Sequence, residues 1–368
     1  MIPLVDLQAQ HRQIADQVRD GFARVCESAS FILGRDVTAF EGAFASFLGV
    51  RHCIGVANGT DALELALRAV GIGPGDEVIV PVNSFIASAL AVARAGATPV
   101  FVDCDPTYHL IDTRQVGALI GPRTKAIMPV HLFGQMAAIE EFQTDVRTRG
   151  VWLIEDAAQA QGATRHGKAA GGFGAVAGTS FYPGKNLGAY GDGGAVLTNS
   201  DDVAAKVRAL HNYGSEVKYH HPETGFNSRL DTLQAVVLNA KLPHLAGWNE
   251  ARRQAAQWYH ELLAKLDAVT LPATLPGNEH IWHLYVVRVP RRDDVLHKLH
   301  GAGIGAGVHY PVPMHLQGAF QRLGYQRGDF PVAEAAAAEV LSLPLFPEIT
   351  PEQQRYVVSE LEKALQGA

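Results

Sequence analysis

Short apolar runs recur along much of this chain, and they constrain its fold more than any other feature. Five of them have the length and composition of buried strands, and they span residues 77–81, 98–103, 126–130, 151–156 and 194–198. Amphipathic stretches typical of helices lie between several of them, such as residues 61–70 and 84–95. Strands that are apolar on both faces and alternate with helices form a mostly parallel sheet that helices cover on both sides. The sequence therefore predicts an α/β fold.

The pattern changes near residue 245. A long helical stretch and a shorter mixed segment follow, with predicted elements at residues 248–266 (helix), 281–290 (strand), a helix ending near Gly301, and 351–365 (amphipathic helix). A chain of 368 residues is long enough for two structural units. We therefore predict a large domain over residues 1–245, which includes the N-terminal segment, and a smaller α+β domain over residues 246–368.

Composition and charge argue against several classes of protein. The net charge of −6 and the absence of long Lys or Arg runs give no sign of nucleic-acid binding. Residues 1–6 lack the basic and apolar regions of a signal peptide. The apolar stretch 86–102 contains Arg94 and Pro99, so its pattern is not that of a membrane span. We expect a cytoplasmic protein without nucleic-acid or membrane partners.

Metal and disulfide chemistry are not expected. Cys26, Cys53 and Cys104 are odd in number and show no CxxC spacing, so we predict buried or inert thiols rather than disulfides or a zinc site. None of the sixteen histidines lies in an HExxH motif, and His220-His221 is an isolated pair. We therefore predict no bound metal.

The most informative motif is the run SFYPGKNLGAYGDGG at residues 180–194, which contains Lys185. Glycines, a proline and aromatic residues surround this lysine, and no acidic residue is close to it in sequence. Such a setting lowers the pKa of an amine, as a Schiff-base lysine requires. Gly184-Lys185 also resembles the end of a nucleotide-binding P-loop. Because Thr179 stands where that loop needs glycine, and Asn186 where it needs Ser or Thr, a nucleoside triphosphatase is disfavoured.

A phosphate site is predicted where Asn58-Gly59-Thr60 begins a helical stretch. Free backbone N–H groups and the positive end of a helix attract phosphate, and the hydroxyl of Thr60 adds a donor. An ordinary helix cap is the alternative interpretation. Ser180 is a further candidate donor to a phosphate, although serine is also common in turns.

Asp156 ends an apolar strand, at the edge of the sheet where open α/β proteins bind ligands. A carboxylate there needs a cation, and the protonated ring nitrogen of pyridoxal 5′-phosphate (PLP) is such a cation. Gln159 could then donate to the phenolic oxygen of PLP, and Phe85 could stack on its ring. Each of the three also has an ordinary interpretation, as a helix cap, a loop glutamine or a core aromatic side chain.

Taken together, these motifs resemble the DegT/DnrJ/EryC1/StrS family of sugar aminotransferases, which have fold type I of the PLP enzymes. The similarity covers essentially the whole chain. It includes IPLVDL at residues 2–7, NGTDAL at 58–63, EDAAQA at 155–160, the Lys185 run and GFNSRLD at 225–231. The resemblance implies a large domain built on a seven-stranded sheet and a smaller C-terminal domain.

The resemblance also implies a role for each cofactor residue. Lys185 forms the Schiff base with PLP and then moves protons, while Asp156 pairs with the ring nitrogen. The other cofactor contacts come from Gln159 at the phenolic oxygen, Phe85 on the ring, and Gly59, Thr60 and Ser180 at the phosphate. A branch of the family that dehydrates its substrate has histidine in place of the lysine, so Lys185 favours amino transfer.

Further residues are implied to serve a dimer and the substrate. The family places the residue that matches Asn227 in the neighbouring subunit's active site, where it contacts the phosphate, which implies a homodimer with shared sites. Arg229, His309 and Tyr310 match positions near the nucleotide sugar, and Tyr182 is assigned to the substrate as well. Residues 213–226 are expected to form a loop near the neighbouring active site.

The sequence around Lys185 is similar to that of family members that use L-glutamate to aminate C-3 of dTDP-linked 3-keto-6-deoxyhexoses. Members that act at C-4 more often carry Gly-Glu-Gly-Gly where this chain has Gly-Asp-Gly-Gly at 191–194. The product would be an amino-deoxysugar for a polysaccharide, such as the O-antigen of lipopolysaccharide, or for a natural product. A UDP-linked 3-keto uronic acid and a C-4 keto sugar are alternative substrates. A non-catalytic PLP-binding regulator, a structural protein without cofactor and a PLP enzyme for small amino acids are the rival classes.

Overall fold

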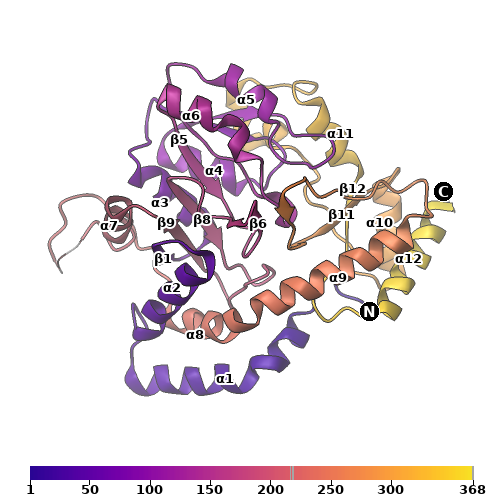
Figure 1. Cartoon of the computed structure of the whole chain (residues 1–368), viewed down its shortest axis with the longest axis horizontal. Helices are drawn as coiled ribbons and strands as arrows, with labels where there is room; N and C mark the ends of the chain where they lie inside the picture. The colour runs from indigo at the N-terminus through magenta and orange to yellow at the C-terminus, as the bar shows by residue number, and fades with distance from the viewer. Residues whose placement is uncertain (216, 218, 367–368) are drawn as a thin grey trace.

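The computed structural model describes residues 1–215, 217 and 219–366, and within them a seven-stranded sheet forms the centre of the larger core (Figure 1). Its strands, in spatial order, are β1 (His52–Val56), β9 (Gly194–Thr198), β8 (Val176–Ser180), β5 (Trp152–Asp156), β4 (Thr124–Ile127), β2 (Glu77–Pro81) and β3 (Thr98–Val102). In this sheet β9 runs antiparallel to both neighbours, and the pairs from β8 to β3 are all parallel. The predicted α/β fold with a mostly parallel sheet is confirmed.

Four of the five predicted strands lie within one residue of their expected bounds, and the fifth is displaced. β4 ends at Ile127 instead of reaching residue 130, since Pro129 has no N–H to donate to a neighbouring strand. The sequence did not predict β1 or β8. In β8, a Cβ atom added to Gly178 would lie 2.7 Å from Leu63 Cδ2, so this position must be glycine. The glycine interrupts the apolar run by which a buried strand is recognised.

Helices cover both faces of the sheet, and alternate residues of each strand face opposite sides. Val78 and Val80 pack into one core and Ile79 into another, which explains the continuous apolar runs. The first face is covered by α3 (Gly59–Ala69), α4 (Ala87–Ala95) and α7 (Asp201–Leu210). The second is covered by α2 (Arg35–Leu48), α5 (Thr113–Leu119), α6 (Gln143–Arg149) and α8 (Thr232–Lys241).

A second hydrophobic core lies toward the C-terminus. It is built from α9 (Leu245–Leu263), β11 (Tyr285–Arg288), α10 (Arg292–Gly301), β12 (Val340–Leu343) and α12 (Pro351–Gln366). β11 and β12 pair antiparallel. Ile2 joins this core, donating its N–H to Gly303 O at 2.9 Å and accepting from Gly305 N at 2.7 Å. The domain boundary near residue 245 stays a prediction, and α9 begins at that residue.

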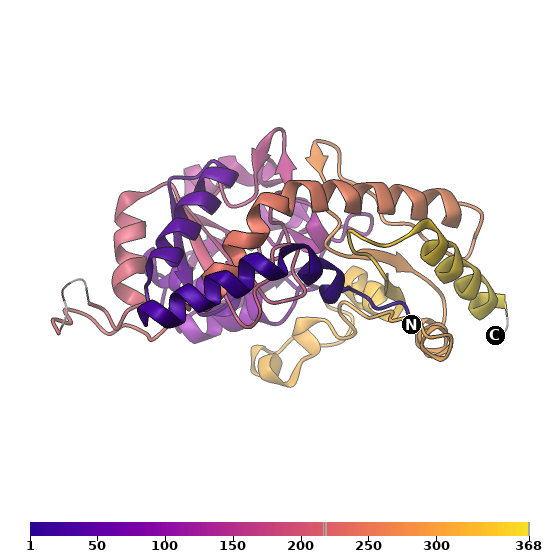
Figure 2. The same ribbon diagram turned by 90° about the horizontal axis from the view of Figure 1, so that it is seen from below.

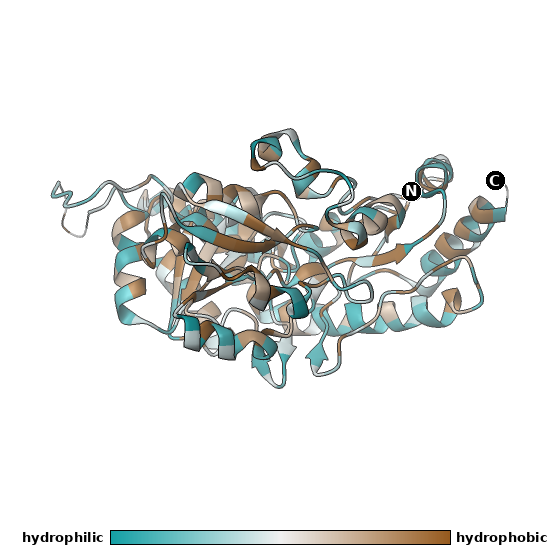
Figure 3. Cartoon of the chain, turned by 90° about the horizontal axis from the view of Figure 1, so that it is seen from above, coloured by the Kyte–Doolittle hydropathy of each residue, from teal (hydrophilic) through white to brown (hydrophobic). Residues whose placement is uncertain are grey.

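Further elements lie beside these two cores. They are α1 (Leu7–Ser28), which packs on α8, α11 (Pro331–Glu339), and a three-stranded sheet of β10 (Asn278–Glu279), β6 (Thr164–Arg165) and β7 (Lys168–Ala169). The first residues of the chain and helix α12 lie at the end of the molecule formed by the second core (Figures 1 and 2). The described part of the segment after α7 projects from the opposite end, and in Figure 3 the central strands are the most apolar part of the ribbon.

Over the described residues, no helix has the length and apolar character that a bilayer crossing requires. The three cysteines are free, and burial raises the thiol pKa of Cys53 and Cys104, whereas Cys26 is exposed. The same part of the chain contains no group of three or more His, Cys, Asp or Glu residues that could hold a metal ion.

Candidate active site

The N-terminus of α3 faces the end of β8. Asn58 caps the helix by accepting from Asp61 N at 2.8 Å, which leaves the N–H groups of Gly59 and Thr60 without partners inside the helix. A Cβ atom added to Gly59 would lie 2.6 Å from Ser180 Cβ, so only glycine permits this approach. The structure therefore brings the three predicted phosphate-binding residues together, in a cradle of N–H and hydroxyl donors at a helix N-terminus.

Asp156 lies at the carboxyl end of β5 and is 4% exposed. Its Oδ2 accepts from Ser88 Oγ at 2.7 Å and its Oδ1 from Ala158 N at 3.1 Å. Burial raises the pKa of this carboxyl group, and the hydrogen bonds and the nearby charge of Lys185 oppose that rise. A buried carboxylate with two neutral donors is suited to pair with a cationic ring N–H.

Gln159 is held with its amide nitrogen toward the site. Its Oε1 accepts from Phe133 N at 2.7 Å, and its Nε2 donates to Tyr310 Oη at 3.1 Å. A backbone N–H can only donate, so it sets the orientation of the amide. Gln159 can therefore present a donor to an acidic oxygen, and its predicted role at the cofactor stays a prediction.

Lys185 lies in the loop between β8 and β9. Its backbone N–H donates to Tyr182 O at 2.8 Å, and its side chain is partly buried. Within the described residues its amine forms no hydrogen bond or ion pair. Burial lowers the pKa of this lysine to about 8, against the opposing influence of Asp156, whose charge lies within electrostatic range. Lys185 and Asp156 thus share one site, and the amine has the lowered pKa that a Schiff-base lysine needs.

Aromatic and imidazole rings border this site. The ring of Phe85 is 51% exposed, and its centroid lies 5.4 Å from that of Tyr310. His309 Nδ1 is hydrogen-bonded to Ser342 Oγ at 2.7 Å. Burial and the charge of Lys185 lower the pKa of His309 to about 4, so the ring is neutral at physiological pH. These rings provide a stacking surface and a neutral hydrogen-bonding group close to the lysine.

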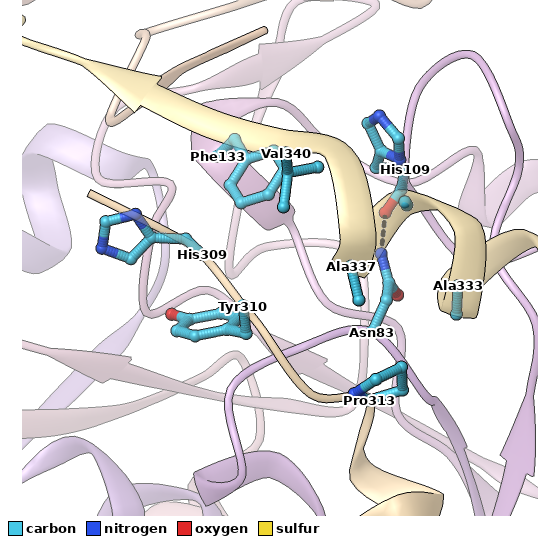
Figure 4. Close-up of a pocket in the computed structure, with 10 residues that line it drawn as sticks. Asn83, His109, Phe133, His309, Tyr310, Pro313, Ala333, Ala337 and Val340 are labelled. Atoms are coloured by element: carbon cyan, nitrogen blue, oxygen red, sulfur yellow. Dashed lines mark hydrogen bonds between the residues drawn. The ribbon is translucent and has the colours of Figure 1, made fainter. Parts of the chain in front are cut away.

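A small cavity of about 10 Å³, room for one water molecule, adjoins His309 and Tyr310 (Figure 4). Asn83 lines it and donates to His109 O at 2.8 Å, the dashed bond of Figure 4. The Oδ1 atom of Asn83 is buried without a hydrogen-bond partner in the described structure. The cavity therefore places an unused acceptor next to the predicted substrate residues.

Asn227 and Arg229 are hydrogen-bonded to each other, and Ser228 between them donates to Asp61 Oδ2 at 2.8 Å near the start of α3. Arg229 donates to Asn227 Oδ1 at 2.7 Å and to Asn212 Oδ1 at 2.9 Å, and its guanidinium group lies over the ring of Tyr213. Among the described contacts, no hydrogen bond joins either residue to Lys185, Asp156 or Gln159. Tyr182 is 60% exposed. The predicted roles of all three in substrate or cofactor binding stay predictions, and residues 216 and 218 of the predicted loop lie outside the described residues.

The support beneath Asp156 was not predicted from the sequence. Glu155 is fully buried and accepts from the backbone N–H groups of Gly171, Phe173 and Gly174 and from His131 Nε2 at 2.9 Å. Burial alone would raise the pKa of Glu155, yet these hydrogen bonds hold it below its ordinary value. A charged residue inside an apolar strand was the available signal, but its partners come from distant loops.

Replacing Glu155 with glutamine is expected to lower the free energy of unfolding by about 3–5 kcal/mol, because the new NH₂ group would face N–H donors in a buried site. Urea unfolding at pH 7 measures this loss. Glu339→Gln, at a half-exposed ion pair with Arg288 3.7 Å away, is the matched control and should change stability by less than about 0.5 kcal/mol. Equal losses in the two variants would contradict the role given to Glu155.

Comparison with known proteins shows what this arrangement is similar to. The family model of the DegT/DnrJ/EryC1/StrS aminotransferases matches residues 12–362. The chain is 47% identical to a pleiotropic regulatory protein of Geobacillus stearothermophilus, over 98% of this chain and 97% of that protein. It is 46% identical to a UDP-N-acetyl-3-dehydro-α-D-glucosamine 3-aminotransferase of Acidithiobacillus ferrooxidans, over 100% and 98% of the two chains.

Two further relatives extend the comparison. A dTDP-3-amino-3,6-dideoxy-α-D-galactopyranose transaminase of Aneurinibacillus thermoaerophilus is 44% identical over 99% of both chains. The crystal structure of DesV from S. venezuelae, in complex with a ketimine intermediate, superposes with a TM-score of 0.96 at 44% identity and covers 98% of both chains. The similarity to these relatives in fold and in sequence therefore extends along nearly the whole chain.

Proposed function

Because the chain belongs to the DegT/DnrJ/EryC1/StrS family, and is thus a PLP-dependent nucleotide-sugar aminotransferase, we propose that it aminates C-3 of a dTDP-linked 3-keto-6-deoxyhexose. L-Glutamate is the proposed amino donor. The observation that carries the cofactor assignment is the convergence of Lys185, Asp156 and Gln159 beside the helix N-terminus at Gly59. The proposed sugar rests on the sequence of the motif around Lys185 and on the similarity to the dTDP-sugar transaminase of Aneurinibacillus thermoaerophilus.

The residues present fit PLP. The cradle at Gly59, Thr60 and Ser180 suits a phosphate, and the buried Asp156 suits a protonated ring nitrogen. Gln159 offers a donor for the phenolic oxygen. When bound, PLP supplies an aldehyde and a ring that withdraws electrons from the bonds at the reacting carbon.

The chain's own residues then divide the work. Lys185 would hold the cofactor, and its amine would take and return a proton at its Nζ atom. Asp156 would keep the ring nitrogen charged, and Phe85 would provide a face for stacking. His309 is neutral and Tyr310 remains protonated, because burial and the charge of Asp156 raise the pKa of its hydroxyl group. Neither therefore competes with Lys185 for the proton.

Cofactor attachment is expected to depend on pH through Lys185. Only the uncharged amine attacks an aldehyde, and burial lowers its pKa from 10.5 to about 8. The rate at which the cofactor-free protein takes up PLP should therefore rise with pH and reach half of its maximum near pH 8. Stopped-flow absorbance between pH 6 and pH 10 measures this rate. A midpoint above pH 10 would show that the amine is not desolvated.

The proposed substrate is tested by absorbance of the PLP-loaded protein. L-Glutamate should remove the band of the lysine-linked cofactor, and dTDP-3-keto-6-deoxyglucose should restore it. A band that returns only with a UDP-linked 3-keto uronic acid, or with a C-4 keto sugar, would replace the proposed sugar. The relative from Geobacillus stearothermophilus gives specific support to a regulatory alternative. A band that glutamate leaves unchanged would favour that alternative.

A homodimer with shared active sites is proposed as well. Phe31, Ile32 and Leu33 are each 44–48% exposed, and Ile32 pairs with Asp231 in an antiparallel bridge. An exposed apolar surface thus lies beside the segment that carries Asn227 and Arg229. Apolar surface of this kind is typical of an interface between copies.

Shared sites predict complementation between two inactive variants, Lys185→Ala and Arg229→Ala. Arg229 donates to Asn227 Oδ1, so both side chains are proposed to reach the neighbouring site. In a mixed dimer, one site would then contain Lys185 of one subunit and Arg229 of the other. Random mixing makes half of the dimers mixed, each with one intact site, so about a quarter of the wild-type activity should return. Sites built within single chains would give no return of activity, and sedimentation velocity would show whether dimers form at all.

A further inference from the structure

The residue after the lysine is buried in a polar network. Asn186 is 2% exposed, and its side chain points into the interior. Its Nδ2 donates to Asn249 Oδ1 at 2.8 Å and to Ile281 O at 3.2 Å. Its Oδ1 is hydrogen-bonded to His283 Nδ1 at 3.1 Å. Every polar atom of this amide therefore has a partner.

The donors and acceptors of this network can be assigned in only one way. Ile281 O can only accept, so the nitrogen of Asn186 must face it and the oxygen must face His283. His283 Nδ1 is then the donor. Burial lowers the pKa of His283 well below 6.5, so its ring is neutral and Nε2 carries a lone pair. At the other end, Asn249 Nδ2 donates to Gln161 O at 3.0 Å.

The network joins the lysine loop to three other parts of the fold. Asn249 belongs to α9, His283 precedes β11 and Gln161 follows β5. Asn249 and His283 are only 3% and 7% exposed. His283 lies within electrostatic range of Lys185, whose charge contributes to its low pKa. The loop has a second anchor, because the buried Lys241 donates to Gly188 O at 2.7 Å.

We propose that Asn186, Asn249 and His283 form a relay of hydrogen bonds that positions Lys185, with Asn186 as the positioning residue. The relay holds the backbone beside the lysine against α9 and the segment before β11. The amine is thereby kept in its desolvated place at the cofactor site. Buried networks whose members are all paired are rigid, and removing one member leaves others unpaired. The inference rests on the proposed cofactor role of Lys185.

The test measures the lysine in the full-length, cofactor-free protein. Pyridoxal is added at a series of pH values, the adduct is reduced with borohydride, and mass spectrometry counts the label on Lys185. In Asn186→Ala the loop is expected to relax toward solvent, so the pKa of the amine should rise from about 8 toward 10.5. A rise of one unit would cut the uncharged fraction at pH 8 about fivefold, and labelling with it.

Two further variants keep the outcome decisive. Asn249→Ala removes a relay member that does not adjoin Lys185, and it should shift the labelling profile in the same direction. Gln354→Ala is the control, because Gln354 is equally buried and donates to Ala255 O at 2.8 Å, within the second core. It should lower the melting temperature without moving the labelling profile of Lys185.

The outcomes separate the relay from the proposed function. A profile shared by the wild type, Asn186→Ala and Asn249→Ala would overturn the relay, as would an equal shift in Gln354→Ala. If Asn186→Ala does not fold, Asn249→Ala decides alone. If the wild-type Lys185 takes up no label at any pH, the cofactor role itself fails.

Discussion

Lys185→Ala is expected to lower the turnover of the nucleotide sugar by more than about 10³-fold, because one amine both bonds the cofactor and moves the proton. No other lysine side chain is described at this site to replace it. The loss is measured as formation of amino sugar with saturating PLP and L-glutamate. The same variant should show no absorbance band of a lysine-linked cofactor. Turnover within tenfold of the wild type would exclude Lys185 as the catalytic amine.

A measurement of stability distinguishes the loss of turnover in Lys185→Ala from misfolding of the variant. The folded-state pKa of Lys185, about 8, lies below the 10.5 of an unfolded chain. Between these values the unfolded state binds more protons, so the wild-type cofactor-free protein should gain stability as pH rises from 8 to 10.5. Lys185→Ala should show a smaller gain, which the buried Lys241 still provides because its pKa is also lowered to about 8, and it should be at least as stable at pH 7. Lys363→Ala, on the surface beside Glu360, is the control for activity.

Asp156→Asn is the second large effect, with turnover expected to fall by about 10²–10³-fold. The amide matches the shape of the carboxylate but carries no charge, so it cannot stabilise a protonated ring nitrogen. Equilibrium titration with PLP should show weaker binding, and the pH dependence of the bound cofactor's spectrum should change.

Asp103→Asn is the matched control for Asp156→Asn. Asp103 is also a buried aspartate just beyond a strand of the same sheet, and it accepts from Val332 N and Ala333 N at the start of α11. Its loss should lower the melting temperature and leave the cofactor's spectrum unchanged. If Asp103→Asn and Asp156→Asn impair catalysis equally, the effect of Asp156 is on folding and not on the cofactor.

Sequence patterns predicted the parts of this fold that depend on burial alone. Continuous apolar runs marked β2, β3, β5 and β9, since each is covered on both faces. β8 was not predicted, because its packing against α3 requires Gly178, which interrupts the apolar run. The antiparallel direction of β9 could not be read either, because an apolar run carries no information about direction.

Some residues of the candidate site could be predicted from the sequence, whereas their partners could not. Asp156 and Lys185 could be predicted because each stands out within its own segment, as a charge at a strand end and an amine among glycines. The partner of Gln159 is the backbone of Phe133, and the relay behind Asn186 reaches His283, far along the chain. Such partners depend on which loops the fold brings together, and local residue patterns do not record that.

The placement of Ile2 has a consequence for how the chain folds during synthesis. Ile2 is translated long before its backbone partners Gly303 and Gly305, and Leu4 O likewise accepts from the distant Leu345 N at 3.1 Å. The segment Ile2–Leu4 can therefore dock only after Gly303, Gly305 and Leu345 have been translated. Contacts so distant in sequence form late and raise the contact order. The docking of this segment should close the second core around Ile2.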